Sequence, residues 1–406
     1  MADAPSVSLI IASRHRPAML ARCLTAVAQL DHPAFEVVVV ADPVGLEVAR
    51  AWPVKAVPFN ERNISVARNL GIAAAAGDVV AFIDDDAVPE PLWLAHLTQP
   101  FADPQVVASG GFVVGWNGIS FEWKSGAVDR HLALHRLPVP EDRVSLHRLQ
   151  PGIAVDIKGV NCAYRRAMLV EMGGFDPLLR YYLDETELNL RLAQRPGLTA
   201  VVPMARVHHR KAASDQRRAD RAPASLYDIG FSSSVTLRRH GAEPAEQQAA
   251  QMQIAANERQ KLLRMMVSGV IGTDDVGRLL SSLDLGFAAG LAVSLPPLSS
   301  ISGQAEGFVA FPAVRRDLVQ IKGWVWRAKS LRAKARALVA EGRIVRLYLF
   351  SPTALFHKHI FSDGYWCQHG GLFGKSDRSD AVFRLWWFGK RFDRESARFL
   401  TGFRDS

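Results

Sequence analysis

The 406-residue chain is predicted to fold as an α/β protein, with a mostly parallel sheet flanked by helices and a mainly helical C-terminal extension. Two observations predict this class. Within residues 7–83, apolar runs rich in β-branched residues alternate with segments of helical spacing, which is the order of βαβ units. Polar side chains directly follow three of these runs, at the carboxyl ends where parallel sheets bind ligands. Together they point to one sheet with a ligand site along one edge.

The first half of the chain supplies the elements of this sheet in order. Strands are expected at residues 7–12, 36–40, 54–58 and 79–83, with helices between them at 17–30 and 66–76. Farther along, the pattern predicts helices at 93–101, 165–172 and 185–193, and strands at 106–108 and 156–163. Gly173 and Gly174 are expected to close the helix at 165–172. Residues 114–147 are irregular and rich in aromatic and histidine residues, which favours contact with a substrate.

The composition changes after about residue 239 and predicts further units. Two helices are expected at 246–267 and 274–285, and the Pro-, Ser- and Gly-rich stretch 295–307 is typical of a linker. The remainder of the chain is basic and aromatic. The expected units are a ligand-binding domain at 1–239, a helical segment at 240–300, and a C-terminal region of unknown role at 301–406.

The net charge of +9 suits an anionic partner, whether a nucleotide diphosphate, an acidic lipid surface or a nucleic acid. Between Arg315 and Arg336, basic residues alternate with Trp324, Trp326 and Leu331. This pattern has two interpretations, a helical face that lies on an anionic membrane surface or a solvated basic face. Nucleic acid is not expected as a partner, because no nucleic-acid-binding motif accompanies the charge.

Three sequence features bear on location. The N-terminus lacks the pattern of a secretory signal, no stretch of about twenty apolar residues occurs, and three widely spaced cysteines form no CxxC pair. We therefore expect a cytoplasmic protein, in one interpretation peripheral on the inner face of the plasma membrane. The basic stretch 211–221 has two interpretations of its own, a mobile lid or a solvated loop.

Three consecutive acids, Asp84, Asp85 and Asp86, follow the strand at 79–83. Adjacent carboxylates repel one another unless water solvates them or a divalent metal bridges them, and their oxygens favour hard ions such as Mg²⁺ or Mn²⁺. A solvated turn is the alternative. Asp42 follows the strand at 36–40, and Ser13 and Arg14 follow the first strand. Three polar clusters are therefore expected along one edge of the sheet.

A set of motifs in a fixed order extends over residues 6–210. They are SLIIASRHRP (8–17), VVVVAD (37–42), NISVARNLG (63–71), GDVVAFIDDD (77–86), GVNCAYRR (159–166), GGFD (173–176) and DETEL (184–188). In this order the set resembles the family 2 glycosyltransferases, inverting enzymes of the Rossmann-like GT-A fold. Members of that family move a sugar from a nucleotide diphosphate donor to an acceptor.

The resemblance implies roles for several residues. Asp84 and Asp86 are similar to the outer acids of the family's DxD motif, one touching the ribose and the other a metal, Mn²⁺ or Mg²⁺. Asp42 is similar to the acid that hydrogen-bonds the base, Arg68 to a basic residue beside the donor, and His208 or His209 to the histidine that completes the metal site. Ser13, Arg14 and Asp85 are implied to lie near the nucleotide-sugar. The first strand ends in Ala-Ser-Arg-His, where the family commonly has Pro-Thr-Tyr-Asn, so uridine is favoured only by its frequency in the family.

Inversion needs a base that takes the proton of the acceptor hydroxyl. The pair Asp184 and Glu185 stands where the family usually reads Glu-Asp with the second acid as base. Glu185 is therefore the positional candidate, and Asp184 is the reserve. An alternative remains, that both acids only begin a helix, where negative charge is favourable.

The resemblance thus implies a metal-dependent inverting glycosyltransferase, with a UDP-sugar as the favoured donor and a glycan or lipid-linked acceptor. Such an enzyme would serve the synthesis of cell-surface polysaccharide or glycoconjugate. The reversed acid pair keeps open a non-catalytic protein that binds a nucleotide-sugar or acts as a scaffold. A sugar-phosphate nucleotidyltransferase is less favoured, because residues 13–20 contain no glycine for a phosphate loop.

Overall fold

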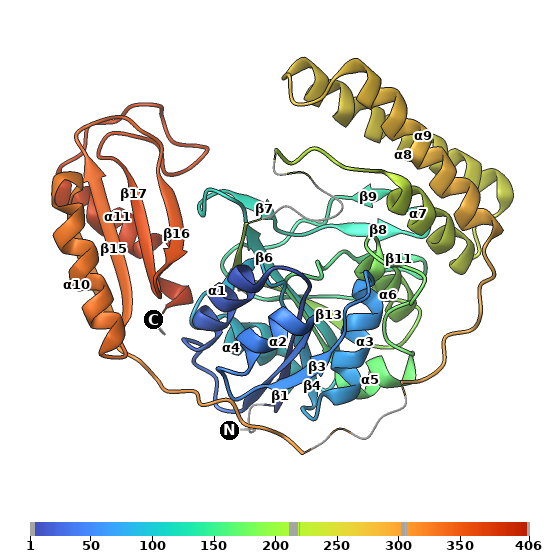
Figure 1. The fold of residues 1–406 in the computed structure, drawn as a ribbon, viewed down its shortest axis with the longest axis horizontal. Helices are drawn as coiled ribbons and strands as arrows, with labels where there is room; N and C mark the ends of the chain where they lie inside the picture. The colour runs from blue at the N-terminus through green and yellow to red at the C-terminus, as the bar shows by residue number, and fades with distance from the viewer. Residues whose placement is uncertain (1–4, 211–217, 219, 302–304, 306, 404–406) are drawn as a thin grey trace.

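The computed structural model describes residues 5–210, 218, 220–301, 305 and 307–403. Within these residues the first part of the chain forms a ten-stranded, mixed and largely parallel sheet with helices on both faces (Figure 1). The strand order is β10-β13-β6-β12-β4-β1-β2-β3, with β5 beside β13 and β7 beside β6. The predicted fold class is therefore confirmed.

The strands of this sheet are β1 (Val7–Ser13), β2 (Phe35–Ala41), β3 (Lys55–Pro58), β4 (Val79–Phe82), β5 (Ala87–Pro89), β6 (Val106–Val114), β7 (Phe121–Trp123), β10 (Ser145–His147), β12 (Cys162–Arg165) and β13 (Leu198–His209). A separate three-stranded sheet contains β8 (Ala127–Asp129), β9 (Leu134–His135) and β11 (Ile153–Val155). Strands β3, β2, β1 and β4 run parallel to one another. Their carboxyl ends, with the predicted polar clusters, therefore meet at one edge.

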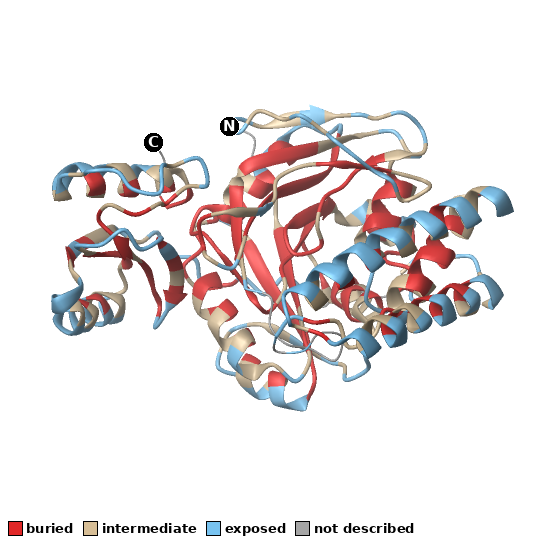
Figure 2. Cartoon of the chain, turned by 90° about the horizontal axis from the view of Figure 1, so that it is seen from above, coloured by how far each residue is buried: buried red, intermediate tan, exposed pale blue. Residues whose placement is uncertain are grey.

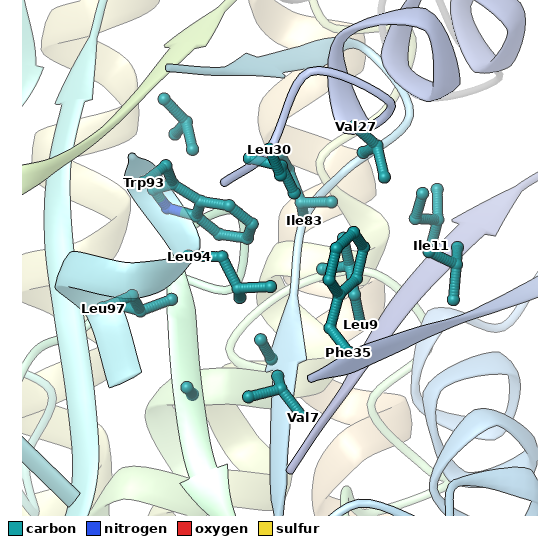
Figure 3. Packing of buried hydrophobic residues seen from close by; sticks show 14 of the residues in the cluster. Val7, Leu9, Ile11, Val27, Leu30, Phe35, Ile83, Trp93, Leu94 and Leu97 are labelled. Carbon is teal, nitrogen blue, oxygen red and sulfur yellow. The ribbon is translucent and has the colours of Figure 1, made fainter. Parts of the chain in front are cut away.

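Both faces of the large sheet are buried, which explains why its strands are continuous apolar runs. Side chains from β1 alternate, so that Leu9 and Ile11 pack against one set of helices and Ile10 against the other. Figure 3 shows the first of these clusters, in which Trp93 and Leu97 lie beside the strands. Figure 2 shows the buried strands as a red layer between helices that are exposed on their outer sides.

The helices that cover one face are α1 (Pro17–Val27), α2 (Pro43–Ala49) and α4 (Trp93–Thr98), the last continued by the 3-10 turn η1 (Gln99–Ala102). The opposite face carries α3 (Ile64–Ala74), α5 (Arg166–Glu171) and α6 (Asp184–Leu192). The predicted helices appear within a few residues of their expected bounds, and α2 is an addition.

Three helices follow: α7 (Tyr227–Arg239), α8 (Pro244–Val267) and α9 (Thr273–Ala292). The predicted helical character of this part is confirmed, and α9 continues seven residues beyond the expected end at 285. Helices α7 and α9 approach closely through glycines. A Cβ on Gly286 would lie 2.1 Å from the carbonyl oxygen of Tyr227, and one on Gly230 would lie 2.2 Å from that of Leu283.

The final part of the chain forms a second α/β unit, which the sequence patterns do not predict. Its elements are β14 (Leu318–Trp324), η2 (Val325–Arg327), α10 (Ala328–Ala340), β15 (Ile344–Ser351), β16 (Lys358–Ser362), β17 (Tyr365–Gly371), α11 (Phe388–Arg398) and η3 (Leu400–Gly402). Its sheet has the order β14-β15-β17-β16. An apolar cluster that includes Val88, Trp366 and Phe403 joins this unit to the first sheet. Figure 1 shows it at the opposite end of the molecule from α8 and α9.

Several expectations need correction. Residues 156–161 are not a strand, since the strand begins only at Cys162 and the buried side chain of Asn161 instead bonds the carbonyl oxygens of Phe112 and Ala205. The basic stretch from Arg315 to Arg336 is not one helical face but a strand followed by a helix. Leu331 is buried there, against the sheet. Most of 211–221 lies outside the described residues.

Candidate functional site

The three acids occupy the turn between β4 and β5, at the carboxyl edge of the sheet. One ligand atom from each of Asp84, Asp86 and His209 lies within 4.8 Å of the others. Nε2 of His209 is 3.2 Å from Oδ1 of Asp86. Strand β13 brings the histidine there, because β13 pairs with β5, opposite Ala87. The arrangement gathers two carboxylates and an imidazole from positions 123 residues apart in the sequence.

The neighbouring histidine points elsewhere. His208 is buried, and its Nε2 lies 2.9 Å from Oε1 of Glu90. Its ring also lies 4.7 Å, centroid to centroid, from that of Trp366 in the C-terminal unit. Successive side chains of a strand face opposite sides, so only one of the two can face the acids. His208 is therefore not one of the clustered ligands, and the sequence expectation narrows to His209.

The middle acid has a different environment from its neighbours. Asp85 is fully buried and accepts a hydrogen bond from the hydroxyl of Ser13 at 2.7 Å. A guanidinium nitrogen of Arg16 lies 2.6 Å from its other oxygen. Burial raises the pKa of Asp85 to about 7 even though Arg16 opposes the shift. Ser13 and Asp85, both expected near the nucleotide-sugar, thus bind each other and lock the end of β1 to the acid turn.

Arg68 of α3 connects the acid turn to the candidate base. Its buried guanidinium lies 3.2 Å from Asp84 and forms a short ion pair with Asp184. Gly159 permits this placement, because a Cβ there would lie 2.6 Å from the Nη2 atom of Arg68. A buried cation between two acids fixes their separation. Arg68 was expected beside the donor. In the structure its guanidinium instead bridges two acids of the chain, Asp84 and Asp184.

Asp184 and Glu185 begin α6 and follow Leu183, which has a left-handed φ of 64°. Such a φ is strained for leucine, and the turn directs the two acids to different surroundings. Burial raises the pKa of Asp184 well above the usual range of an aspartate, against the charge of Arg68. Burial also acts to raise the pKa of Glu185, but Lys158 and Arg68 hold it below its usual range. The pKa directions thus make Glu185 the more readily ionised acid of the pair.

Glu185 opens onto a cavity of about 700 Å³ between the first domain and the helices that follow it. Tyr181, Tyr182 and Lys158 lie on the wall beside it. Helix α8 supplies the facing wall, including Ile254. The volume is in the range of ordinary small-molecule sites. Sequence patterns do not reveal this helical wall, because the contact joins segments about seventy residues apart.

The two remaining candidates lie at the ends of β1 and β2. Asp42 is buried, and its Oδ1 accepts a hydrogen bond from the backbone N–H of His15 at 3.0 Å. Burial acts to raise the pKa of Asp42, but its contacts with His15 outweigh that effect, and the pKa lies below the usual range. Arg14 donates to the carbonyl oxygen of Asn60 at 3.1 Å. Both sit on the same edge of the sheet as the acid turn.

Two further residues bond the acid turn and were not singled out in the sequence, Arg22 through its side chain and Arg210 through its backbone. Arg22 of α1 donates to the carbonyl oxygen of Asp86 at 3.1 Å and leaves its buried Nε without a partner. The backbone N–H of Arg210 bonds the same carbonyl oxygen at 3.2 Å. Helical spacing predicts α1 but not which of its arginines faces the edge.

The clustered residues fit a divalent cation. Two carboxylates and an imidazole are a suitable donor set for Mn²⁺ or Mg²⁺. Against burial, which lowers it, contacts with Asp86 and Glu122 raise the pKa of His209 to about 9. The imidazole is therefore positively charged at neutral pH, and its charge lies beside the same carboxylates that a metal cation would contact. A metal that binds there displaces its proton.

The sheet and the acid turn at its carboxyl edge define an α/β domain with a candidate metal site. Residues 8–173 match the family model described as Glycosyl transferase family 2. This part of the chain is therefore similar to glycosyl transferase family 2.

Relatives of known name support this assignment. The chain is 25% identical over 255 residues to the O-antigen biosynthesis protein RfbC of Myxococcus xanthus. The aligned region covers 56% of this chain and 19% of that relative. It is 32% identical over 124 residues to the glucosyl-dolichyl phosphate glucuronosyltransferase of Haloferax volcanii. That aligned region covers 28% of this chain and 35% of the relative. The matches thus span only a minor part of each relative's length.

The fold is similar to that of solved structures. One is S. aureus TarS 1-349 in complex with UDP-GlcNAc, which matches with a TM-score of 0.46 at 16% identity and covers 70% of this chain and 81% of that one. A mannosyltransferase from Pyrobaculum calidifontis in complex with GDP-Man and Mn²⁺ gives a TM-score of 0.42 at 17% identity, with coverage of 72% of this chain and 88% of that one.

Among the described residues, no helix combines the length and apolar character needed to cross a bilayer.

Proposed function

We propose that this domain is a metal-dependent inverting glycosyltransferase, which transfers a sugar from a nucleotide diphosphate-sugar to a hydroxyl of a glycan or lipid-linked acceptor. One observation carries the proposal. The candidate metal ligands Asp84, Asp86 and His209 lie together, and Arg68 links Asp84 to Asp184, the residue next to Glu185. A donor held at the acids would thus have a base within the same site.

The donor side is assigned to the acid turn. A divalent cation bound there would neutralise the charge that develops on the departing nucleotide diphosphate. The guanidinium of Arg22 approaches the turn from α1 and is placed to attract phosphate oxygens, and Arg210 reaches the turn through its backbone N–H at the end of β13. Asp42, with Ser13 and Arg14, borders the region assigned to the nucleoside. A uridine nucleotide stays the favoured donor on the resemblance alone.

The acceptor side is assigned to the cavity beside Glu185. Tyr181 and Tyr182 offer aromatic faces there, and Lys158 keeps Glu185 ionised. In the proposed reaction the Glu185 carboxylate takes the proton of the attacking hydroxyl, the oxygen forms the new glycosidic bond, and the nucleotide diphosphate leaves. Asp184 is less suited to be the base, because it is buried against Arg68.

The names of the relatives support a role in cell-surface polysaccharide or glycoconjugate synthesis. One is named for O-antigen biosynthesis and another for transfer to a glucosyl-dolichyl phosphate. Substrates of those kinds would place the enzyme in the cytoplasm or peripherally on the inner face of the plasma membrane, as part of the same proposal.

The first test is calorimetric binding of UDP, GDP, CDP and dTDP in the presence of Mn²⁺, Mg²⁺ or EDTA. We expect one nucleotide to bind only with metal, and Asp86→Ala to abolish that binding. Asp142→Ala, at an acid that is exposed and outside the site, is the matched control. Metal-independent binding, or unchanged binding by Asp86→Ala, would contradict the assignment of the acid turn.

A second variant separates catalysis from binding. Glu185→Gln should leave metal-dependent nucleotide binding intact and lower transfer by a factor of about 10² to 10⁴, because it removes a general base without changing the shape of the site. The reversed acid pair motivates the competing hypothesis of a non-catalytic binding protein. Nucleotide binding by the wild type without transfer or donor hydrolysis, and no effect of Glu185→Gln on any sugar product, would favour that hypothesis.

A further inference from the structure

The C-terminal unit brings three loops to one edge of its sheet. Strands β14, β15 and β17 run parallel, so the segments that follow them leave the sheet on the same side. We call these segments, residues 325–327, 352–357 and 372–387, the aromatic edge.

The first and third loops are brought together by the flanking residues Trp324 and Phe388, and the second and third loops share a hydrogen bond. The ring of Trp324, at the end of β14, stacks on that of Trp326 with centroids 4.9 Å apart, and lies 4.8 Å from that of Phe388. The backbone N–H of Phe373 donates to the carbonyl oxygen of Thr353 at 3.1 Å, which joins the second loop to the third. The ring of Phe373 also lies 5.6 Å from that of Phe383.

This edge exposes an unusual share of apolar side chains. Eight of the 23 exposed large apolar residues in the described chain belong to it: Val325, Trp326, Leu355, Phe356, Val382, Phe383, Leu385 and Trp387. Trp387 is 85% exposed and Leu385 is 77% exposed. Isolated exposed apolar residues are normal on a protein surface, whereas a contiguous group marks an interaction site. The edge is therefore a candidate contact surface.

Cations accompany the apolar side chains. Arg327, Arg378 and Arg384 are exposed and form no ion pair with the described residues. The acids of the edge, Asp377 and Asp380, are already paired with Arg398 and Arg394. Residues 318–403 contain 16 Lys and Arg against six Asp and Glu, a net charge of +10 in a chain whose total is +9. The charge of the protein is thus concentrated in this unit.

We propose that the aromatic edge docks on an anionic lipid bilayer. Tryptophan, phenylalanine and leucine at loop tips enter the boundary between headgroups and acyl chains, and neighbouring arginines bind the acidic headgroups. A second copy of this chain fits the surface less well, because a two-fold pairing would bring the unpaired arginines against one another. The inference does not rest on the proposed transfer reaction, since no residue of the acid turn takes part.

Flotation of the full chain with vesicles tests the proposal. We expect binding to phosphatidylcholine vesicles that contain phosphatidylglycerol, and weak binding to phosphatidylcholine alone or at high salt. The double variant Leu385→Ser and Trp387→Ser should weaken partitioning at least about tenfold, and Arg384→Gln about fivefold. The matched controls are the double variant Met252→Ser and Leu285→Ser, and Arg259→Gln, at exposed residues of α8 and α9. These controls should bind as the wild type does.

Folding and association are followed in the same samples. Each variant should keep the melting temperature and nucleotide binding of the wild type, so that lost vesicle binding reports the surface alone. Equal weakening by the edge and control variants would overturn the proposal, as would binding to neutral vesicles that salt does not reduce. A wild-type dimer that Leu385→Ser and Trp387→Ser dissociates, without effect on vesicles, would assign the edge to a second copy instead.

Discussion

At the scale of single residues, the candidate site depends on which side of a strand each side chain faces. His208 and His209 are equivalent in the sequence motif, but β13 directs His209 to the acids and His208 to Glu90. Asp84, Asp85 and Asp86 are likewise equivalent in the sequence, and the structure buries the middle one against Ser13 and Arg16. Neighbouring residues therefore take different roles.

This difference predicts opposite effects of two histidine variants. His209→Ala should weaken metal-dependent nucleotide binding at least about tenfold, because it removes a proposed ligand and leaves the fold intact. His208→Ala should keep that binding and lower the free energy of unfolding by about 1–3 kcal/mol, because buried Glu90 loses its partner. Calorimetry and thermal unfolding measure the two effects. Loss of metal-dependent binding in His208→Ala alone would exchange the two assignments.

At the scale of elements, predicted helices and strands agree with the structure where the local pattern is strong. The runs of β1, β2 and β4 are apolar on both faces, so their assignment does not depend on distant contacts. The expected strand at 156–163 was wrong in its first six residues, because Asn161 bonds the distant carbonyl oxygens of Phe112 and Ala205. A pattern in one segment cannot reveal partners about fifty residues away.

The helical part offers a prediction that uses two glycines of the same helix. Gly286→Ala should destabilise the pair α7 and α9 by about 1–3 kcal/mol, because its Cβ would meet the Tyr227 carbonyl oxygen at 2.1 Å. Gly277→Ala, with no atom within 4 Å of its Cβ, should instead stabilise α9 by up to about 1 kcal/mol. Urea unfolding compares the two variants. A stability gain in both would show that the helices can separate without cost.

At the scale of the whole molecule, two buried histidines predict how stability depends on pH. Burial lowers the pKa of His32 in the first domain to about 4, and burial likewise lowers the pKa of His357 in the C-terminal unit to about 4. Their unfolded value is about 6.5, so between these values the unfolded state binds more protons. Stability should therefore fall as the pH drops from about 6.5 to 4, by roughly 3 kcal/mol for each histidine.

Thermal unfolding at a series of pH values measures this dependence. His32→Gln should make stability depend less on pH, because glutamine does not become protonated when the chain unfolds. A melting temperature that drops as steeply in His32→Gln as in the wild type would assign the acid sensitivity to other groups.

The aromatic edge also belongs to this scale. In the sequence, basic residues alternate with aromatic and apolar ones between Arg315 and Arg336. Only Val325, Trp326 and Arg327 of that stretch lie at the edge, which is completed by residues 352–357 and 372–387. The surface arises because three parallel strands end together, and no single segment carries the whole pattern.

The sequence by itself determined the α/β class, the order of the first strands and helices, and the placement of Asp42 and the three acids at strand ends. These features depend on local periodicity and on the rule that parallel strands share a carboxyl edge. Only the tertiary structure decided that His209 joins the acids, that Asp85 is buried, that Arg68 connects Asp84 to Asp184, and that α8 walls the cavity beside Glu185. Each of these depends on contacts between segments far apart in the chain, whose side-chain directions are set only when the elements pack.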